Sequence, residues 1–180
     1  MLSESNEEDL KAVFIFILNQ LLNKYTIIHQ TGSSLKFKDF EKMVILKQGL
    51  NNDKRNRYIV TKYFLPEEIG EILKASRLVV SRAGINTVSE LIVLEKPSLL
   101  IPLPNSQKDE QMKNAKFLKN LGLGEIKEQK DLTPQIFLLT INQMMQNIDK
   151  YKLSSKQFPF QKNAAKKIVE VIYAAGKNRN

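Results

Sequence analysis

Short apolar runs alternate with helical patterns along this chain, and this alternation restricts the folds that it can adopt. Four runs rich in aliphatic and β-branched residues are typical of strands: Thr26–Gln30, Tyr58–Phe64, Leu78–Ser81 and Ser98–Ile101. Apolar residues at helical spacing predict helices over 9–24, 36–47, 67–75, 87–95, 110–121, 136–148 and 163–174. Strands that alternate with helices indicate βαβ units, so we expect an α/β fold with a Rossmann-like parallel sheet, flanking helices and a helical C-terminus.

Two of the predicted strands, Leu78–Ser81 and Ser98–Ile101, are almost continuously apolar. Such runs are typical of strands that helices cover on both faces of a parallel sheet, so we expect both to be central. Ligands of doubly wound sheets bind outside the carboxyl ends of the strands. The loops that follow the strands are therefore where functional residues are expected.

Composition limits the class of protein. A chain of 180 residues that is 42% hydrophobic suits one compact domain, with a Rossmann-like unit over 1–150 and a basic helical segment over 151–180 that packs on it. The absence of cysteine excludes disulfides and thiol nucleophiles. The longest apolar run, Ala12–Leu18, is far shorter than the roughly 20 residues that span a bilayer, so we expect a soluble protein. The lack of cysteine is compatible with a cytoplasmic location but does not identify the compartment.

The segment 151–180 carries seven basic residues and one acidic residue, a net charge of +6 within a chain of net charge +9. Such a cluster can bind the anionic inner face of a cytoplasmic membrane, or it can be a solvated helix face. Nucleic acid is a weaker candidate partner, because no binding motif accompanies the charge.

The loop Ser81–Thr87 follows an apolar strand and opens a predicted helix. Gly84 permits a close backbone approach or a positive φ where helix amides are free, and Arg82 can add a charge-assisted contact to a diphosphate. Alternatively, Gly84 only permits a tight turn, and Thr87 with Glu90 forms a capping box. A carboxylate in the first helical turn can also accept hydrogen bonds from a ribose diol, which is the candidate role of Glu90.

The loop 102–114 is rich in amide and carboxyl side chains, which suit sugar hydroxyls. Gln111 and Asn114 lie three residues apart on one face of the next predicted helix. The alternative is a polar surface loop in which Asp109 or Ser106 caps that helix.

Three segments in this order resemble the MurG-like glycosyltransferases, specifically the C-terminal, donor-binding domain of glycosyltransferase family 28. The segments are Val80–Leu91, Lys96–Pro102 and Gln111–Ala115, and the resemblance extends over about two thirds of the chain. It implies one half of a two-domain GT-B enzyme that binds UDP-N-acetylglucosamine. The other half would bind the lipid-linked acceptor of peptidoglycan precursor (lipid II) synthesis.

The resemblance also implies roles for individual residues. The diphosphate would meet Arg82, Gly84, Ile85, Asn86 and Thr87, and the ribose would meet Glu90. The backbone of Phe64 would meet the uracil, and the sugar would meet Glu110, Gln111 and Asn114. The sequence departs from the family in two places: Glu110 replaces a glutamine, and no glycine-rich loop or strand precedes the first helix.

The resemblance implies an inverting transfer that uses no cofactor. A helix N-terminus and Arg82 can stabilise the diphosphate, and the sequence has no carboxylate pair or histidine cluster at metal-ligand spacing, so we expect no metal. This half would stabilise the departing UDP, while the acceptor domain or a partner chain would supply the catalytic base, which leaves the catalytic residues here unknown. His29, the only histidine, is expected to make a structural hydrogen bond. Two alternatives stay open: a non-catalytic basic interaction module of the same fold, and the donor-binding subunit of a split lipid-linked N-acetylglucosaminyltransferase.

Overall fold

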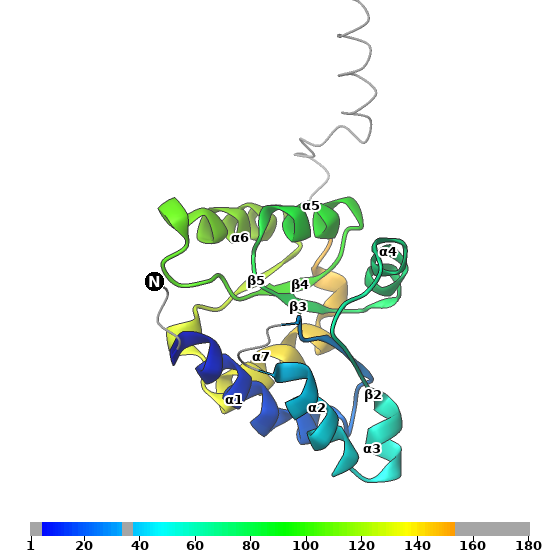
Figure 1. Ribbon diagram of the computed structural model, residues 1–180. Helices are drawn as coiled ribbons and strands as arrows, with labels where there is room; N and C mark the ends of the chain where they lie inside the picture. The colour runs from blue at the N-terminus through cyan, green and yellow to red at the C-terminus, as the bar shows by residue number, and fades with distance from the viewer. Residues whose placement is uncertain (1–4, 34–37, 154–180) are drawn as a thin grey trace, which may run out of the picture.

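The structure is a computed structural model that describes residues 5–33 and 38–153, and it confirms an α/β fold with parallel strands (Figure 1). The α-helices are α1 (Ser5–Leu21), α2 (Asp39–Gln48), α3 (Asn52–Arg57), α4 (Pro66–Ala75), α5 (Ile85–Val93), α6 (Glu110–Asn120) and α7 (Pro134–Gln146). The strands are β1 (Ile27–Gln30), β2 (Tyr58–Thr61), β3 (Val79–Ser81), β4 (Ser98–Leu100) and β5 (Gly124–Ile126). The basic segment beyond residue 153, with the helix predicted over 163–174, lies outside the described residues.

The strands form two parallel sheets and not the single sheet that the sequence predicts. One contains β1 and β2, paired from Ile27 with Tyr58 to Gln30 with Thr61, and the other has the order β3-β4-β5. The prediction that Ser98–Ile101 is central is confirmed. The same prediction for Leu78–Ser81 is wrong, because β3 is an edge strand of its sheet. Within the described residues, no strand fills the space that separates β1 from β3.

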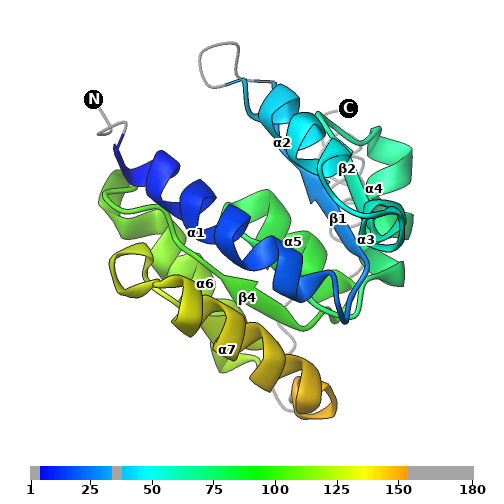
Figure 2. The same ribbon diagram turned by 90° about the horizontal axis from the view of Figure 1, so that it is seen from below.

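Helices cover both faces of the three-stranded sheet. In Figure 1, α5 and α6 lie above it and α1 and α7 lie below, and Figure 2 shows α1 and α7 side by side. All three residues of β4 are buried. Leu100 packs in a cluster with α5 and α6, whereas Leu99 packs in another with α1 and α7. The apolar residues of β4 therefore form the centre of the main core.

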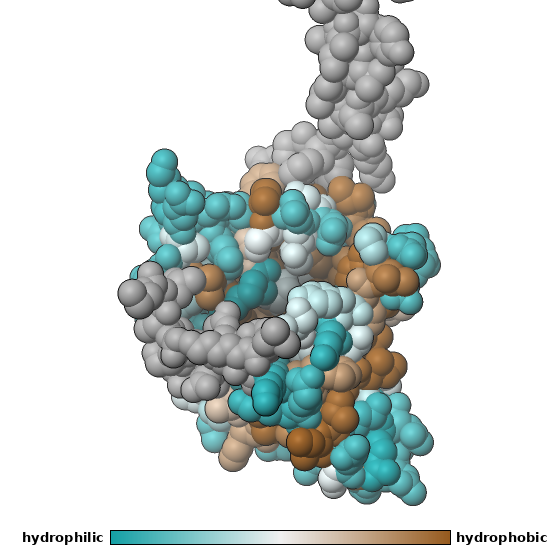
Figure 3. All heavy atoms as spheres, in the orientation of Figure 1, coloured by the Kyte–Doolittle hydropathy of each residue, from teal (hydrophilic) through white to brown (hydrophobic). Residues whose placement is uncertain are grey.

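The two-stranded sheet is covered less completely. A small cluster of Leu18, Leu22 and Tyr58 joins α1 to β2, but Ile28 and Ile59 stay exposed. Figure 3 shows hydrophilic surface over the outer elements α6 and α3 and hydrophobic surface between them, on the side of α4. This part of the chain buries its strands on fewer sides.

Two elements were not predicted from the sequence, and one was predicted too long. The strand β5 has only one large apolar residue, Ile126, and pairing with β4 supports it. Its Gly124 leaves no room for a side chain, since an added Cβ would lie 2.1 Å from the carbonyl oxygen of Ser98. The short helix α3 begins where Asn51 accepts a hydrogen bond from the amide of Lys54. The strand predicted over 58–64 ends at Thr61.

Candidate functional site

Two side chains of α6 hold the loop that follows β3. The side-chain oxygen Oε1 of Gln111 accepts hydrogen bonds from the amides of Ala83, at 3.3 Å, and Leu103, at 2.9 Å. The side-chain amide of Asn114 donates to the carbonyl oxygen of Ala83 at 3.1 Å. The structure thus brings the candidate sugar residues to the candidate diphosphate loop, and there they fix the backbone from which α5 starts.

Arg82 extends from the same loop toward the end of β4. Its guanidinium donates to the carbonyl oxygen of Ile101 at 3.1 Å and to Oε1 of Gln129 at 2.8 Å. Gln129 is one of the few buried polar residues of the described chain, and the sequence analysis missed it. Since both terminal nitrogens of Arg82 have protein acceptors, Arg82 supports the loop geometry in this conformation. Its contact with a diphosphate stays a prediction.

The helix α5 begins two residues earlier than the sequence predicts. Gly84 is its N-cap, with φ −63° and ψ 147° and no side-chain cap, so the predicted capping box of Thr87 and Glu90 is wrong. Of the two possibilities that glycine permits here, the structure does not show the positive φ. An added Cβ at Gly84 would meet no atom within 4 Å. The space before the first amides of α5 is therefore open to a close approach, and such amides bind anions.

Glu90 lies in the second turn of α5 and not in the first turn, because the helix starts at Ile85. The inner face of this helix carries the buried residues Val88, Leu91 and Ile92. Asn86 and Glu90 are both exposed, and their spacing of four residues places them on one face. A ligand whose phosphates lie at the helix start can therefore extend along this face to the carboxylate of Glu90.

The loop between β4 and α6 has an unusual backbone. Asn105, Lys108 and Asp109 have positive φ angles of 58°, 50° and 54°. Such conformations are uncommon outside glycine and cluster at ligand-binding segments. Asp109 is the N-cap of α6 but makes no side-chain cap, and Glu110 is exposed at the first helical position. The suggestion that Asp109 or Ser106 caps this helix is therefore wrong for Asp109, while the Ser106 hydroxyl accepts a long bond from the amide of Gln111, at 3.3 Å.

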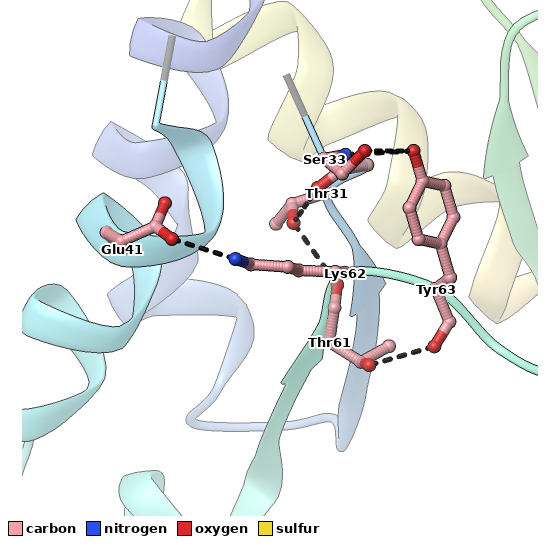
Figure 4. A network of polar contacts seen from close by, with 7 residues as sticks. Thr31, Ser33, Glu41, Thr61, Lys62 and Tyr63 are labelled. Atoms are coloured by element: carbon pink, nitrogen blue, oxygen red, sulfur yellow. Dashed lines mark hydrogen bonds and ion pairs between the residues drawn. The ribbon is translucent and has the colours of Figure 1, made fainter. Parts of the chain in front are cut away.

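A polar network lies at the carboxyl ends of β1 and β2 (Figure 4). The hydroxyl of Thr31 donates to the carbonyl oxygen of Thr61 at 3.2 Å, and the hydroxyls of Ser33 and Tyr63 lie 2.6 Å apart. On its outer side, Lys62 pairs with Glu41 at 2.9 Å. These contacts join the loops that leave the two strands and fix the backbone just before Phe64.

Phe64 follows this network, and its amide lies 3.4 Å from Oε1 of Gln30. It lies in the loop that follows β2, whereas the other candidate residues lie in the loop after β3 and in the helices α5 and α6. The structure therefore places the predicted uracil contact and the predicted phosphate contacts on opposite sides of the gap between the sheets.

His29 lies in β1 and makes the structural hydrogen bond that was expected. Its Nδ1 is 2.8 Å from the hydroxyl of Tyr58, and its ring contacts Phe14 edge-on, with the centroids 4.8 Å apart. Burial lowers the pKa of His29, although the charge of Asp39 opposes the shift. Burial also raises the pKa of Tyr58. Both groups are therefore neutral near pH 7, as a packing pair requires.

A cavity of about 1080 Å³ lies between the two sheets. Residues of β1 and β3 line it, together with side chains of α1 and α7. It shares Arg82 with the candidate donor site, but Gly84, Glu90 and Gln111 lie outside it. Among the described residues, no group of three or more His, Cys, Asp or Glu side chains is placed to hold a metal ion. None of the described helices has the length and apolar character needed to cross a membrane.

Comparison with known protein families gives one match that extends over nearly the whole chain. The family described as "Glycosyltransferase family 28 C-terminal domain" matches residues 4–172. The chain belongs to this family. The matched residues include all of the candidate residues, from Phe64 to Asn114. The match confirms the resemblance to family 28 that the sequence shows.

Two relatives of this family-28 chain share a name. An N-acetylglucosamine transferase from Clostridium tetani, named "UDP-N-acetylglucosamine--N-acetylmuramyl-(pentapeptide) pyrophosphoryl-undecaprenol N-acetylglucosamine transferase", is 34% identical over 156 residues. Its namesake from Clostridium kluyveri is 34% identical over 160 residues. Each alignment includes 86% of this chain but 40% of the relative. The chain thus spans about two fifths of the length of these relatives.

Solved structures show the same fold. The crystal structure of MurG from Acinetobacter baumannii superposes with a TM-score of 0.68 at 23% identity, over 91% of this chain and 48% of that one. A glycosyltransferase of kitacinnamycin gives a TM-score of 0.53 at 14% identity, over 84% and 34% of the two chains. At these identities, the superpositions establish the fold of the family-28 chain and nothing about its ligands.

Proposed function

We propose that this chain is the UDP-N-acetylglucosamine-binding half of an inverting glycosyltransferase that acts on a lipid-diphosphate acceptor in peptidoglycan precursor synthesis. The open space before the first amides of α5, at Gly84, is the observation that carries the proposal. It lies at the carboxyl edge of β3, where α/β folds bind nucleotides. The names of the clostridial relatives supply the donor and acceptor classes.

In this proposal, the diphosphate lies against the first amides of α5, where the helix dipole favours negative charge. Asn86 and Thr87 line this position, and Glu90, one turn further, accepts hydrogen bonds from the ribose diol. Phe64 binds the uracil through its backbone. Glu110 and the free side-chain groups of Gln111 and Asn114 bind the sugar. The amides at the start of α5 stabilise the negative charge of the diphosphate, and no metal ion takes part in this proposal.

The reaction follows from this placement. The acceptor hydroxyl oxygen forms a bond to the anomeric carbon while the bond between that carbon and the β-phosphate oxygen breaks, with inversion. UDP leaves with the electron pair, and the amides of α5 stabilise its growing negative charge. The hydroxyl proton passes to a base that we assign to an acceptor-binding domain or partner chain. Residues 1–180 alone would therefore bind the donor but transfer no sugar.

Calorimetric titration of the full chain with UDP-N-acetylglucosamine tests the proposal. Glu90→Gln should weaken binding by about tenfold, since a neutral amide is a weaker partner for the ribose diol than a carboxylate. Glu71→Gln, on the exposed face of α4, is the matched control and should bind like wild type. Equal affinities for wild type and Glu90→Gln would exclude the proposed contact between Glu90 and the ribose.

Gly84→Ala tests the phosphate position separately. The backbone angles of Gly84 suit alanine and the site is open, but alanine is a poorer N-cap than glycine, so the free energy of unfolding should change by no more than about 1 kcal/mol. The new methyl group would occupy the space that we assign to the diphosphate, so UDP should bind at least about tenfold more weakly. Unchanged UDP affinity in the folded variant would place the diphosphate elsewhere.

We also propose that the protein is cytoplasmic and associates with the inner face of the membrane through its basic segment 151–180. The net charge of +6 should draw it to anionic vesicles, and neutralising Lys162, Lys166 and Lys167 should remove up to about 3 kcal/mol of binding. Co-sedimentation with vesicles that contain phosphatidylserine measures this difference. Equal retention of both proteins at low salt would leave the segment as a solvated surface.

A further inference from the structure

The gap between the two sheets has strand edges for walls. Among the described residues, β1 pairs only with β2, and β3 pairs only with β4, so each presents its other edge to the cavity of about 1080 Å³. Figure 2 shows β1 and β4 pointing in the same direction, and β3 is parallel to β4. The two open edges are therefore parallel. Open edges present unpaired amides and carbonyl oxygens that can bind another strand.

The edge strands β1 and β3 carry large apolar side chains that are exposed to solvent. Val80 in β3 and Ile28 in β1 are each 40% exposed, although the apolar run at β3 is typical of a central strand. The cavity floor is also apolar, because Phe14 of α1 and Phe137, Ile141 and Met145 of α7 line it. An extended apolar chain placed between β1 and β3 would cover these side chains.

The charges at one end of the cavity favour a particular occupant. Lys24 and Arg77 line it just ahead of β1 and β3, and both are exposed. A parallel strand would begin at this end, so acidic residues ahead of that strand would meet these two cations. The basic segment 151–180 has the opposite charge balance. A second copy of the chain has its fully buried strand, β4, already paired between β3 and β5.

We propose that the cavity between β1 and β3 binds a parallel β-strand from a partner polypeptide, composed of β-branched residues and preceded by acidic ones. The inserted strand would pair with both edges and join the two sheets into one. Its carboxyl end would lie between the loops that follow β1 and β3, beside the candidate donor site. This interaction is separate from UDP binding, and either proposal can fail without the other.

A labelled synthetic peptide, Asp-Glu-Val-Thr-Ile-Val-Thr-Val-Gly, serves as the probe for fluorescence anisotropy with the full chain. Saturable binding is expected, since strand addition combines main-chain hydrogen bonds with side-chain burial. Ile28→Lys and Val80→Lys should each weaken it by at least about tenfold. Ile45→Lys is the matched control, because Ile45 is 68% exposed on α2 and does not line the cavity. It should bind like wild type.

A second peptide tests the proposal without any change to the protein, so misfolding of a variant cannot explain the result. Proline at two alternate positions removes ladder amides, so this peptide should not bind. Only the first peptide should slow hydrogen exchange at the amides of Ile28, Gln30 and Val80, which face the open edges of β1 and β3. Equal binding of the proline peptide, or equal weakening by Ile45→Lys, would overturn the proposal. Displacement of the probe by a peptide of residues 154–180 would overturn it in favour of that segment. A dimer that Ile28→Lys converts to monomer would overturn it in favour of a second copy.

Discussion

The two sheets of this protein are built from the same kind of parallel strand pair but differ in how much of each strand is covered. In the β3-β4-β5 sheet, β4 has a strand on each side and helices on both faces, and all its residues are buried. In the β1-β2 sheet, half-buried residues alternate with exposed ones along β1. Parallel pairing alone does not bury a strand. The first sheet supplies most of the core, and the second leaves an open strand edge and polar loops.

The largest effect is expected at Gly124, where the well-covered sheet has no spare volume. Gly124→Ala would place a Cβ 2.1 Å from the carbonyl oxygen of Ser98, so we expect a loss of about 3 kcal/mol in the free energy of unfolding. Gly70→Ala on α4 is the control, since its Cβ would meet no atom within 4 Å, and it should stabilise by about 0.5 kcal/mol. Urea denaturation measures both. Similar stabilities for the two variants would contradict the close approach of β5 to β4.

A smaller difference, of about 2 kcal/mol, is expected between two variants in which each sheet loses one large side chain. Leu100→Ala in β4 should cost about 3 kcal/mol, because Leu100 is fully buried between packed elements. Ile28→Ala in β1 should cost about 1 kcal/mol or less, because Ile28 is 40% exposed. Both values come from urea denaturation under the same conditions. If the two costs were equal, the comparison between a covered and an open sheet would fail.

The smallest effect concerns pH and belongs to the β1-β2 sheet alone. Burial lowers the pKa of His29 in the folded state below its ordinary value of 6.5. The unfolded chain therefore binds more protons as pH falls, and the stability that neutral His29 provides above about pH 6.5 is lost below it. Between pH 7.5 and 5.5, wild type should lose up to about 1 kcal/mol more than His29→Gln.

Hydrogen exchange is the measurement that locates this loss of stability at low pH. Because His29 is the only histidine, the difference between wild type and His29→Gln isolates its titration. Amides of β1 and β2 should lose protection at pH 5.5, while those of β4 should keep theirs. Equal loss in both sheets would show that the chain unfolds as one unit.

Much of the fold was predictable from local patterns, and the exceptions have identifiable causes. The run that became β4 is visible because burial on both faces imposes an apolar composition, and those that became β1 and β3 are visible because β-branched residues favour strands. The strand β5 is not visible, since Gly124 and Glu125 carry no strand signal and pairing with β4 supports it. The start of α5 was also misplaced, because a Thr-x-x-Glu pattern at Thr87 resembles a capping box that the structure does not form.

At the candidate site, the sequence predicted which residues gather but not what they do to one another. Gln111 and Asn114 were expected to face a sugar, and the structure shows them bound to the backbone of Ala83. Arg82 was expected to face a diphosphate, and it contacts Gln129, which lies 47 residues further along the chain. Hydrogen bonds over such separations depend on how helices pack, and periodicity carries no information about them.

By itself, the sequence determined the α/β class, the family-28 motif and the charge distribution, because hydrophobic period, motif spacing and charge are properties of neighbouring residues. The tertiary structure alone decided that α5 begins at an open Gly84, that α6 fixes the loop before it, and that β1 and β3 face one another across a cavity. Each of these depends on distances between segments far apart in the chain. Close packing of the interior sets those distances, because each buried face must lie against a neighbouring element of complementary shape.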